Sequence, residues 1–230
     1  MSNPLIALST VADGNMYIPD NPTDPTVINN RQVFLSKVGL SLETTTRLNV
    51  NMLQRATVTG DTNFCRYAIV SDQDKGKGMR DNDVIVADAL VTTNPGHALF
   101  LPLADCIGTV FYDESQRVLM LSHLGRHSLE QNGTAASIQF LHDHFGCQPS
   151  DLSIWLTPAP SKEAYPIWTM NNKGMKEVIF EQFAAAGVHP YQIVDNPAET
   201  DKDPRFFSYT NYINGRSSDS GRHAMVAMIR

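Results

Sequence analysis

Cysteine is scarce in this chain of 230 residues, and the three that occur form no pattern. Cys65, Cys106 and Cys147 are odd in number, and no two have the CxxC spacing of zinc or redox motifs. A domain held together by disulfides has a dense and even set of cysteines. The sequence therefore excludes a disulfide framework, and we expect reduced thiols.

Long hydrophobic runs and an excess of basic residues are missing as well. No apolar run approaches the roughly 20 residues that cross a bilayer, and the N-terminus lacks a charged region before an apolar core. The formal net charge is −6, whereas proteins that bind the phosphate backbone of nucleic acids need a basic face. We therefore expect a cytoplasmic protein that binds neither membranes nor nucleic acids.

The composition is that of a globular protein, with 42% hydrophobic and 18% charged residues. Apolar runs of strand length interleave with helical patterns at 25–38, 129–145 and 174–186, without regular βαβ alternation. There is no internal repeat, low-complexity segment or break in composition. The sequence therefore predicts a single α+β domain over residues 1–230, with mixed β-sheets flanked by helices. It carries no signal of the oligomeric state.

The stretch Ala87–Ser128 holds the most reactive pair of side chains. Leu99–Val110 is an apolar run with Asp105-Cys106 in its middle, and Val118–Ser122 is a second run that leads into His123. Two strands joined by the short polar turn between them would lie side by side, so that Cys106 and His123 face each other. A thiol and an imidazole held together suit either metal binding or nucleophilic catalysis.

His127 follows His123 by four residues, at the start of a predicted helix. At that spacing two imidazoles can share one face and bind one metal ion. Cys106, His123 and His127 would then be three ligands of a catalytic zinc ion, with water in the fourth position. Each residue alone also has an ordinary interpretation, as a buried cysteine or a structural histidine.

Two further residues suggest chemistry. Asp105 lies within an apolar run, where a carboxylate needs either a partner or a chemical task. Arg222 follows a glycine beside a strand, where it could hold an anion, and a solvated arginine fits that position equally well.

Several motifs together resemble a known family. They occur in the same order over nearly the whole chain, and the more specific ones are ADALVT at 87–92, PGHALFLPLADC at 95–106, HLG at 123–125 and FFSY at 206–209. This set is similar to the bacterial multicopper polyphenol oxidase or laccase-domain family. Its members are also described as purine nucleoside phosphorylases with adenosine deaminase activity, and as a peptidoglycan editing factor.

The resemblance implies a zinc ion held by an upstream His, by the Cys of ADC and by the His of HLG. Cys106 and His123 match the last two, but every histidine of this chain lies at position 97 or later. The best local match places Asn63 where the upstream His would be, and a neutral amide is a poor zinc ligand. We therefore predict His127 as the replacement ligand.

The resemblance also implies an anion site and acid–base groups. Val11 and Thr210-Asn211 stand where the family has basic residues, which leaves Arg126 and Arg222 as candidates for substrate binding. Asp88 and Asp105 are candidates for a catalytic acid or base beside Cys106 and His123.

Four functions are compatible with these residues. The first is a zinc-dependent phosphorylase acting on a purine nucleoside and phosphate, with possible adenosine deaminase activity. The second is a divergent paralogue that has lost the first zinc ligand and binds a ligand or partner. The third is a copper-dependent polyphenol oxidase, which needs many His ligands, whereas only His142-Asp143-His144 has the usual HxH form. The fourth is a metal-free hydrolase using the thiol of Cys106 with His123.

Overall fold

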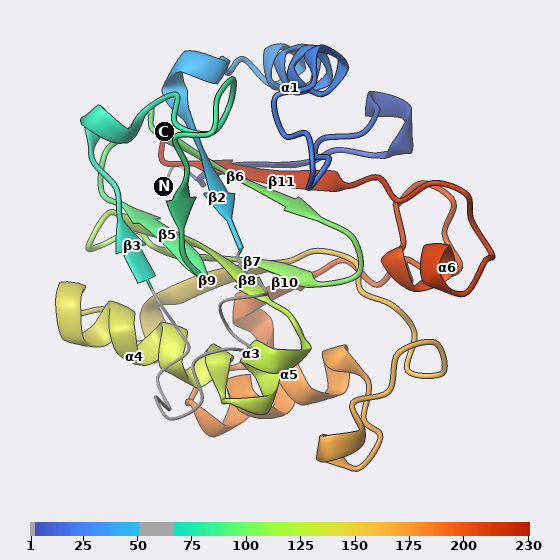
Figure 1. Ribbon diagram of the computed structural model, residues 1–230. Helices are drawn as coiled ribbons and strands as arrows, with labels where there is room; N and C mark the ends of the chain where they lie inside the picture. The colour runs from blue at the N-terminus through green and yellow to red at the C-terminus, as the bar shows by residue number, and fades with distance from the viewer. Residues whose placement is uncertain (1–2, 51–66) are drawn as a thin grey trace.

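The computed structural model describes residues 3–50 and 67–230, which form two packed β-sheets between helices (Figure 1). The five-stranded sheet runs in the order β1 (Leu5–Leu8), β11 (His223–Met228), β6 (Ala98–Leu103), β2 (Thr45–Asn49) and β4 (Ile85–Val86). The six-stranded sheet runs β10 (Ile193–Asp195), β9 (Leu152–Leu156), β7 (Ile107–Asp113), β8 (Val118–Leu124), β5 (Ala89–Thr92) and β3 (Tyr67–Ile69). Both sheets mix parallel and antiparallel pairs, so the predicted α+β class is confirmed.

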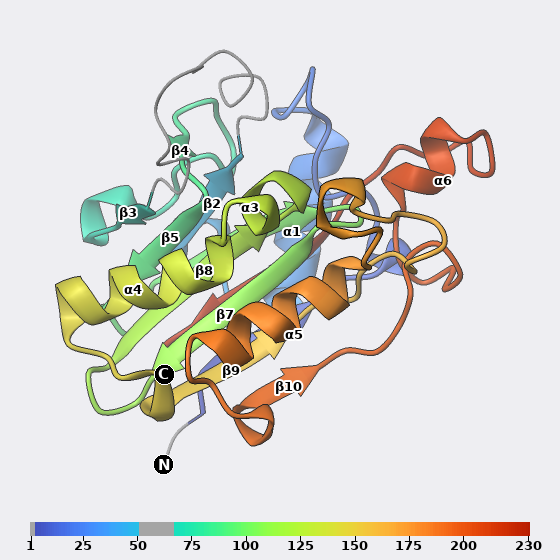
Figure 2. The ribbon, with the colours of Figure 1, turned by 90° about the horizontal axis from the view of Figure 1, so that it is seen from below.

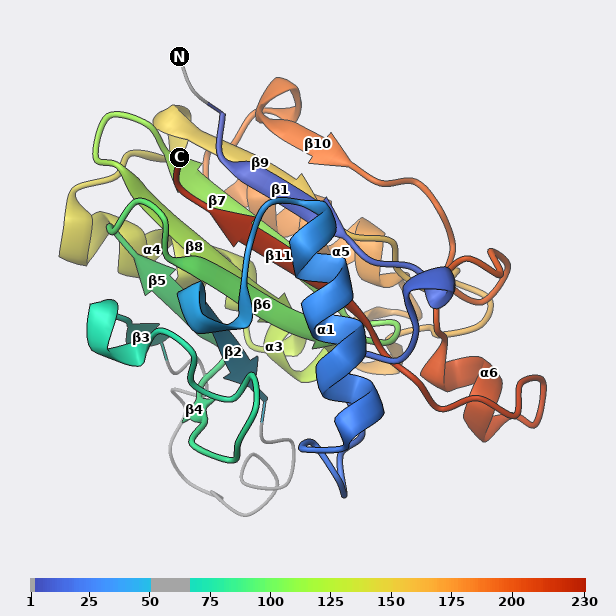
Figure 3. The same cartoon turned by 90° about the horizontal axis from the view of Figure 1, so that it is seen from above.

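Helices cover the two outer faces of this pair of sheets. Helix α1 (Pro25–Lys37) lies on the five-stranded sheet (Figure 3), and α3 (Arg126–Glu130), α4 (Gly133–Phe145) and α5 (Met175–Ala185) lie on the six-stranded sheet (Figure 2). Helix α6 (Tyr209–Ile213) lies at one end of the molecule. Short 3-10 turns occur at Val11–Asp13, Leu42–Thr44, Asp72–Asp74, Pro149–Asp151, Trp168–Met170 and Pro190–Gln192. None of the helices in the described residues is both long and apolar enough to cross a membrane.

Three buried clusters correspond to the three contacts between layers. Phe34 and Leu35 of α1 pack with Phe100 of the five-stranded sheet. Leu101, Val110 and Leu121 belong to the cluster between the sheets. On the far side, Phe111 of β7 lies 6.0 Å from Phe183 of α5, measured between ring centres. Since central strands such as β7 and β8 are covered on both faces, they are buried along their whole length, which explains their continuous apolar runs.

Helix α1 begins at Pro25, where the helical pattern of the sequence begins. The Asp24 carboxylate caps the helix by accepting from the backbone N–H of Thr26 and Val27, at 2.8 and 3.4 Å. Pro25 occupies the first helical position, where its missing N–H costs nothing. Gly39, with a positive φ of 75°, lies just beyond the end of the helix.

The β7–β8 hairpin predicted from the sequence is confirmed. Gly108 pairs with His123 and Ile107 with Leu124, in antiparallel register. The turn is closed by the Asp113 carboxylate, which accepts from the N–H of Ser115. The end of this hairpin away from the turn therefore presents the residues just before β7 and at the end of β8.

The prediction that Leu99–Val110 is one strand is wrong. Strand β6 ends at Leu103 and β7 begins at Ile107, and the two strands belong to different sheets. Between them Asp105 has a φ of 79°, in the left-handed region that non-glycine residues rarely adopt. The chain crosses from one sheet to the other at this bend, which carries Cys106.

The predicted helix over 129–145 is also divided. Helices α3 and α4 are separated at Asn132, which has a φ of 57° and so cannot continue a right-handed helix. The apolar residues of 84–91 do not form one strand either. Strands β4 and β5 lie on either side of Ala87-Asp88 and belong to different sheets.

Candidate functional site

Cys106 and His123 meet at the open end of the β7–β8 hairpin. His123 is the second-last residue of β8, and Cys106 directly precedes β7. Gly125 lies between their side chains, since a Cβ atom placed on it would be 3.0 Å from Cys106 Sγ and 2.9 Å from His123 Cε1. The structure thus brings the thiol and the imidazole together, as the hairpin predicts. Their role in binding or catalysis stays a prediction.

Asp88 lies beside this pair. Its backbone carbonyl accepts a 2.8 Å hydrogen bond from the N–H of His123, and the residue is buried between β4 and β5. The main chain around Asp88 therefore fixes the backbone position of His123. The acid–base role expected of Asp88 is not tested by this contact.

The Asp105 carboxylate connects distant segments. One oxygen accepts from the Thr200 hydroxyl and the other from the backbone N–H of Thr210, both at 2.6 Å. Asp105 is buried, so these bonds satisfy a carboxylate that would otherwise be costly to desolvate. They fix the 200–210 segment next to the bend that carries Cys106, which makes Asp105 an anchor in this structure. The catalytic role expected for it stays a prediction.

The structure does not place His127 with Cys106 and His123 as a metal-holding group. Its Nδ1 lies 3.3 Å from Glu130 Oε2 on its own helix, and its Nε2 lies 3.4 Å from Arg126 Nη2. Within residues 3–50 and 67–230 no group of three His, Cys, Asp or Glu side chains is arranged to hold a metal ion. The spacing argument for this triad needs both histidines in one helix, but His123 is in a strand and α3 begins at Arg126. The role of His127 as a metal ligand stays a prediction.

The described donors fit neither metal centre completely. Cys106 and His123 are two donors, one fewer than the protein ligands of a usual catalytic zinc site. A multi-copper centre needs clustered histidines, but His142 and His144 are exposed on α4 and their Nδ1 atoms approach backbone carbonyls at 3.2 and 3.0 Å. Asn63, the expected counterpart of the upstream ligand, lies outside the described residues.

Tyr165 and Arg222 are close enough to Cys106 to interact with it electrostatically. Burial raises the pKa of Tyr165, and the charges of Cys106 and Asp105 add to the rise. Burial lowers the pKa of Arg222, which the charge of Cys106 partly opposes. The Arg222 guanidinium also lies 5.2 Å from the centre of the Tyr209 ring. Sequence reasoning found Arg222 but missed Tyr165, which lies in a loop with no motif or spacing to mark it.

Arg126, the other expected substrate ligand, has only weak contacts with the side chains of its own helix. Its Nε lies 4.0 Å from Glu130 Oε1, and its charge lowers the pKa that Tyr165 would otherwise have. Arg126 is therefore near Tyr165, and among the described residues it forms an ion pair with Glu130.

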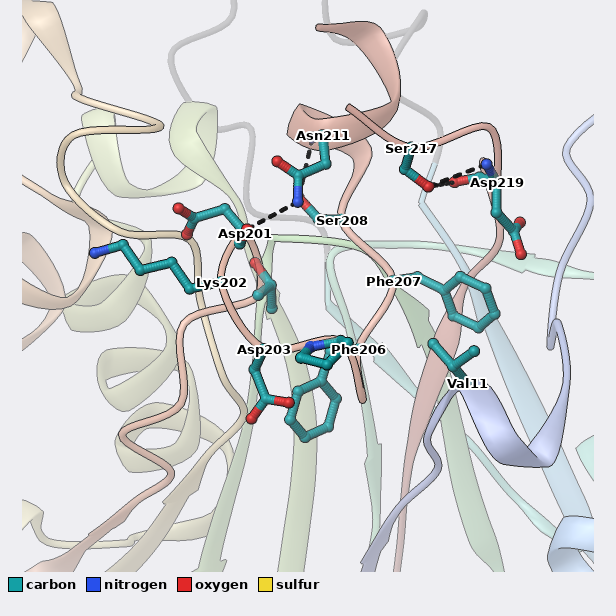
Figure 4. Close-up of a pocket in the computed structure, with 12 residues that line it drawn as sticks. Val11, Asp201, Lys202, Asp203, Phe206, Phe207, Ser208, Asn211, Ser217 and Asp219 are labelled. Atoms are coloured by element: carbon teal, nitrogen blue, oxygen red, sulfur yellow. Dashed lines mark hydrogen bonds between the residues drawn. The ribbon is translucent and has the colours of Figure 1, made fainter. Parts of the chain in front are cut away.

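A pocket of about 300 Å³ lies next to this site rather than in it (Figure 4). Phe206, Phe207 and Ser208 of the FFSY motif line it, together with Asp201 and Asp203. These carboxylates already have partners: Asp201 accepts from the N–H and hydroxyl of Ser161, and Asp203 pairs with Arg205. Neither Cys106 nor His123 lines the pocket. The two phenylalanines are buried, so this motif contributes mainly to the core.

A sequence comparison shows the family. A family model described as multi-copper polyphenol oxidoreductase laccase matches residues 12–177. The chain belongs to this family. The resemblance seen in the sequence motifs is thereby confirmed, although the copper of the family's name does not match the donors described above. No curated protein matches the chain in sequence.

Solved structures share the fold. YlmD from Geobacillus stearothermophilus aligns with a TM-score of 0.82 and 21% identity, over 100% of this chain and 93% of that one. Hypothetical protein YfiH from Bacillus licheniformis aligns with a TM-score of 0.79 and 20% identity, over 98% and 92%. A Neisseria meningitidis protein aligns with a TM-score of 0.65 and 17% identity, over 99% and 90%. At these identities the likeness concerns the fold alone.

Proposed function

We propose that this protein is a purine nucleoside phosphorylase whose reaction takes place beside Cys106 and His123. The observation that carries the proposal is the convergence of these two side chains on Gly125, within a chain of this family. The neighbouring Arg222 and Tyr165 supply a cation and a phenol at the same place. Such a set of groups suits a reaction that joins an anion to a sugar and releases a neutral base.

In the proposed reaction a phosphate oxygen forms a bond to C1′ of the ribose while the bond from C1′ to the purine nitrogen breaks. The products are ribose 1-phosphate and the purine base, which takes up a proton. Arg222 would offset the charge of phosphate near the sugar. Because burial raises the pKa of Tyr165, its phenol stays protonated at neutral pH and can donate a hydrogen bond to the leaving base.

Zinc at Cys106 and His123 stays a prediction within this proposal. If bound, it would be a Lewis acid at the end of the hairpin. The described residues offer two donors for it, so no step of the reaction is derived from the ion. Adenosine deamination is a second activity to assay, because the same position could present water to the purine ring.

The test is chromatography of purine nucleosides incubated with purified protein, with and without phosphate. We expect phosphate-dependent release of base and formation of ribose 1-phosphate. The release should be lost in Cys106→Ala and kept in the matched control Cys147→Ala, which removes a buried cysteine of the α4–α5 core cluster. Elemental analysis of the same samples should find zinc that is lost only in Cys106→Ala. Absence of base release from adenosine, inosine and guanosine would refute the proposal.

The incomplete donor set favours one competing function. A divergent paralogue that binds a ligand or partner through the same region would need no complete metal site, and the described residues contain two donors where three are usual. This alternative predicts nucleoside binding that Cys106→Ala does not weaken, without turnover. Calorimetric titration of nucleoside into both proteins separates the two functions.

A further inference from the structure

Two arginines outside the predicted site residues are almost completely buried. Arg31 of α1 is 0% exposed and Arg47 of β2 is 1% exposed. None of the ion pairs found among residues 3–50 and 67–230 includes either of them. A buried guanidinium without a negative partner is expensive, because its lost hydration is not offset by an opposite charge.

The two guanidinium groups converge on one carbonyl oxygen. Arg47 Nε donates to the Gly78 carbonyl at 2.6 Å, and Arg31 Nη1 approaches the same oxygen at 3.4 Å. Arg31 also donates to the carbonyls of Met16 and Met79, at 2.8 and 2.9 Å. Its Nη2 is buried and has no acceptor among the described residues. Carbonyl oxygens therefore take some of the N–H groups, but no carboxylate of residues 3–50 and 67–230 forms an ion pair with either guanidinium.

The charge of Arg47 disfavours the charged form of Arg31. Burial and the charge of Arg47 lower the pKa of Arg31 to about 9. Burial also lowers the pKa of Arg47, and Tyr17, which is hydrogen-bonded to it, and then Asp81 partly oppose that shift. The Asp81 carboxylate itself accepts from the backbone N–H of Gly78 and Asp83. One oxygen of this carboxylate is thus taken by a turn, and no ion pair joins Asp81 to either arginine among the described residues.

Tyr17 covers Arg47 and joins it to the candidate site. The centre of the Tyr17 ring lies 4.9 Å from Arg47 Cζ, and Tyr17 is only half-buried. The preceding residue, Met16, donates its N–H to the carbonyl of Arg222 at 2.8 Å, and Arg222 donates its own N–H to Asn15 Oδ1 at 2.8 Å. The segment 15–17 therefore lies between the buried arginines and Arg222, whose charge interacts with both Tyr17 and Cys106.

We propose that Arg31 and Arg47 form a binding site for a phosphate-type oxyanion, with Tyr17 as its cover and Arg222 on the side facing Cys106. Planar guanidinium groups match the oxygens of phosphate in pairs, and the orphaned Nη2 of Arg31 supplies a donor that lacks an acceptor. This proposal rests on the proposed function, because it identifies where the phosphate of that reaction binds. Anion binding can nevertheless be measured without turnover.

The experiment is calorimetric titration and thermal unfolding with inorganic phosphate, at constant ionic strength set by chloride. Wild type is compared with Arg47→Met and with the control Arg80→Met, which removes an exposed arginine paired with Glu43. We expect phosphate to bind and to raise the unfolding temperature of wild type and of Arg80→Met. In Arg47→Met we expect the affinity to fall by at least about tenfold. If Arg47→Met does not fold, Arg47→Lys keeps the charge without the planar fork and should also weaken binding.

Two results would overturn the site: no response of wild type to phosphate beyond that to chloride, or equal phosphate affinity in wild type and the Arg47 variants. A parallel titration with adenosine 5′-monophosphate distinguishes free phosphate from a phosphate ester as the ligand, since Arg47→Met must weaken whichever binds. Phosphate binding without nucleoside turnover would refute the proposed function and keep this site. Phosphate-dependent turnover with an unchanged KM for phosphate in Arg47→Lys would support the proposed function and refute this phosphate site.

Discussion

His123 and His127 are four residues apart in the chain, yet the fold gives them different surroundings. His123 is buried at the end of β8 and its ring lies against Gly125 and near Cys106. His127 is on the short helix α3, with an exposed side chain directed at Glu130. The comparison teaches that strand register places a side chain reliably, because each residue has a fixed partner across the ladder. Helical spacing places two side chains together only if one helix contains both.

The largest expected effect is that of His123→Ala. If the proposed reaction takes place at the hairpin end, kcat/KM for phosphate-dependent base release should fall by about 10²- to 10⁴-fold, the usual contribution of a group that acts directly in catalysis. The measurement is steady-state kinetics on protein whose unfolding temperature has been checked. An unchanged kcat/KM would show that His123 has no role in the reaction. His123 and His127 would then not differ in function.

A second buried histidine sharpens the comparison, because burial alone does not indicate function. His223 is 0% exposed, and Phe206 packs edge-on against it at 5.3 Å between ring centres. In the part of the chain that the structure describes, neither ring nitrogen has a hydrogen-bond partner. Burial lowers the pKa of His223 to about 3, from 6.5 in the unfolded chain. Between these pH values the unfolded state binds a proton that the folded state does not, so stability falls as the pH falls.

The expected loss from His223 amounts to at most roughly 5 kcal/mol by pH 3. In His223→Leu, the free energy of unfolding measured by denaturant titration should depend less on pH between about 6.5 and 3. The exposed control His189→Gln should keep the wild-type slope. An identical slope in wild type and His223→Leu would show that other groups cause the acid sensitivity.

Asp105→Asn separates an anchor from a catalytic acid. Asparagine tolerates the left-handed backbone at this position. Both oxygens of Asp105 accept hydrogen bonds, whereas the side chain of Asn has one oxygen and one NH₂ group. The NH₂ group would therefore face either the Thr200 hydroxyl or the Thr210 N–H and lose that hydrogen bond. We expect a loss of about 1–3 kcal/mol in the free energy of unfolding. The pH profile of turnover should keep its shape, whereas loss of one limb of that profile would assign proton transfer to Asp105.

The smallest expected effect is that of His127→Ala. Its contacts are an exposed ion pair with Glu130 and a weak contact with Arg126, and such pairs contribute within about 0.5 kcal/mol. Unfolding temperature, zinc content and kcat/KM should all stay close to wild type. A loss of zinc in this variant would restore His127 as a metal ligand.

Much of the fold follows from local patterns. The apolar runs separated by a polar turn predicted the β7–β8 hairpin, and the helical spacing over 174–186 predicted α5 within one residue at each end. These elements are predictable because their side-chain periodicity repeats over several residues. The bends at Asp105 and Asn132 were not predicted, since each depends on one residue with positive φ. At Asp105 that conformation is held by partners about a hundred residues away in the chain.

The sequence by itself determined the family, the α+β class and the pairing of Cys106 with His123, because collinear motifs and a short hairpin are local properties of the chain. The tertiary structure alone decided that His127 faces Glu130, that Asp105 anchors Thr200 and Thr210, and that Arg31 and Arg47 share one carbonyl. Each of these facts joins a side chain to a backbone group or neighbour whose position is set by packing of other elements. Burial then turns an ordinary charge into one that needs a partner.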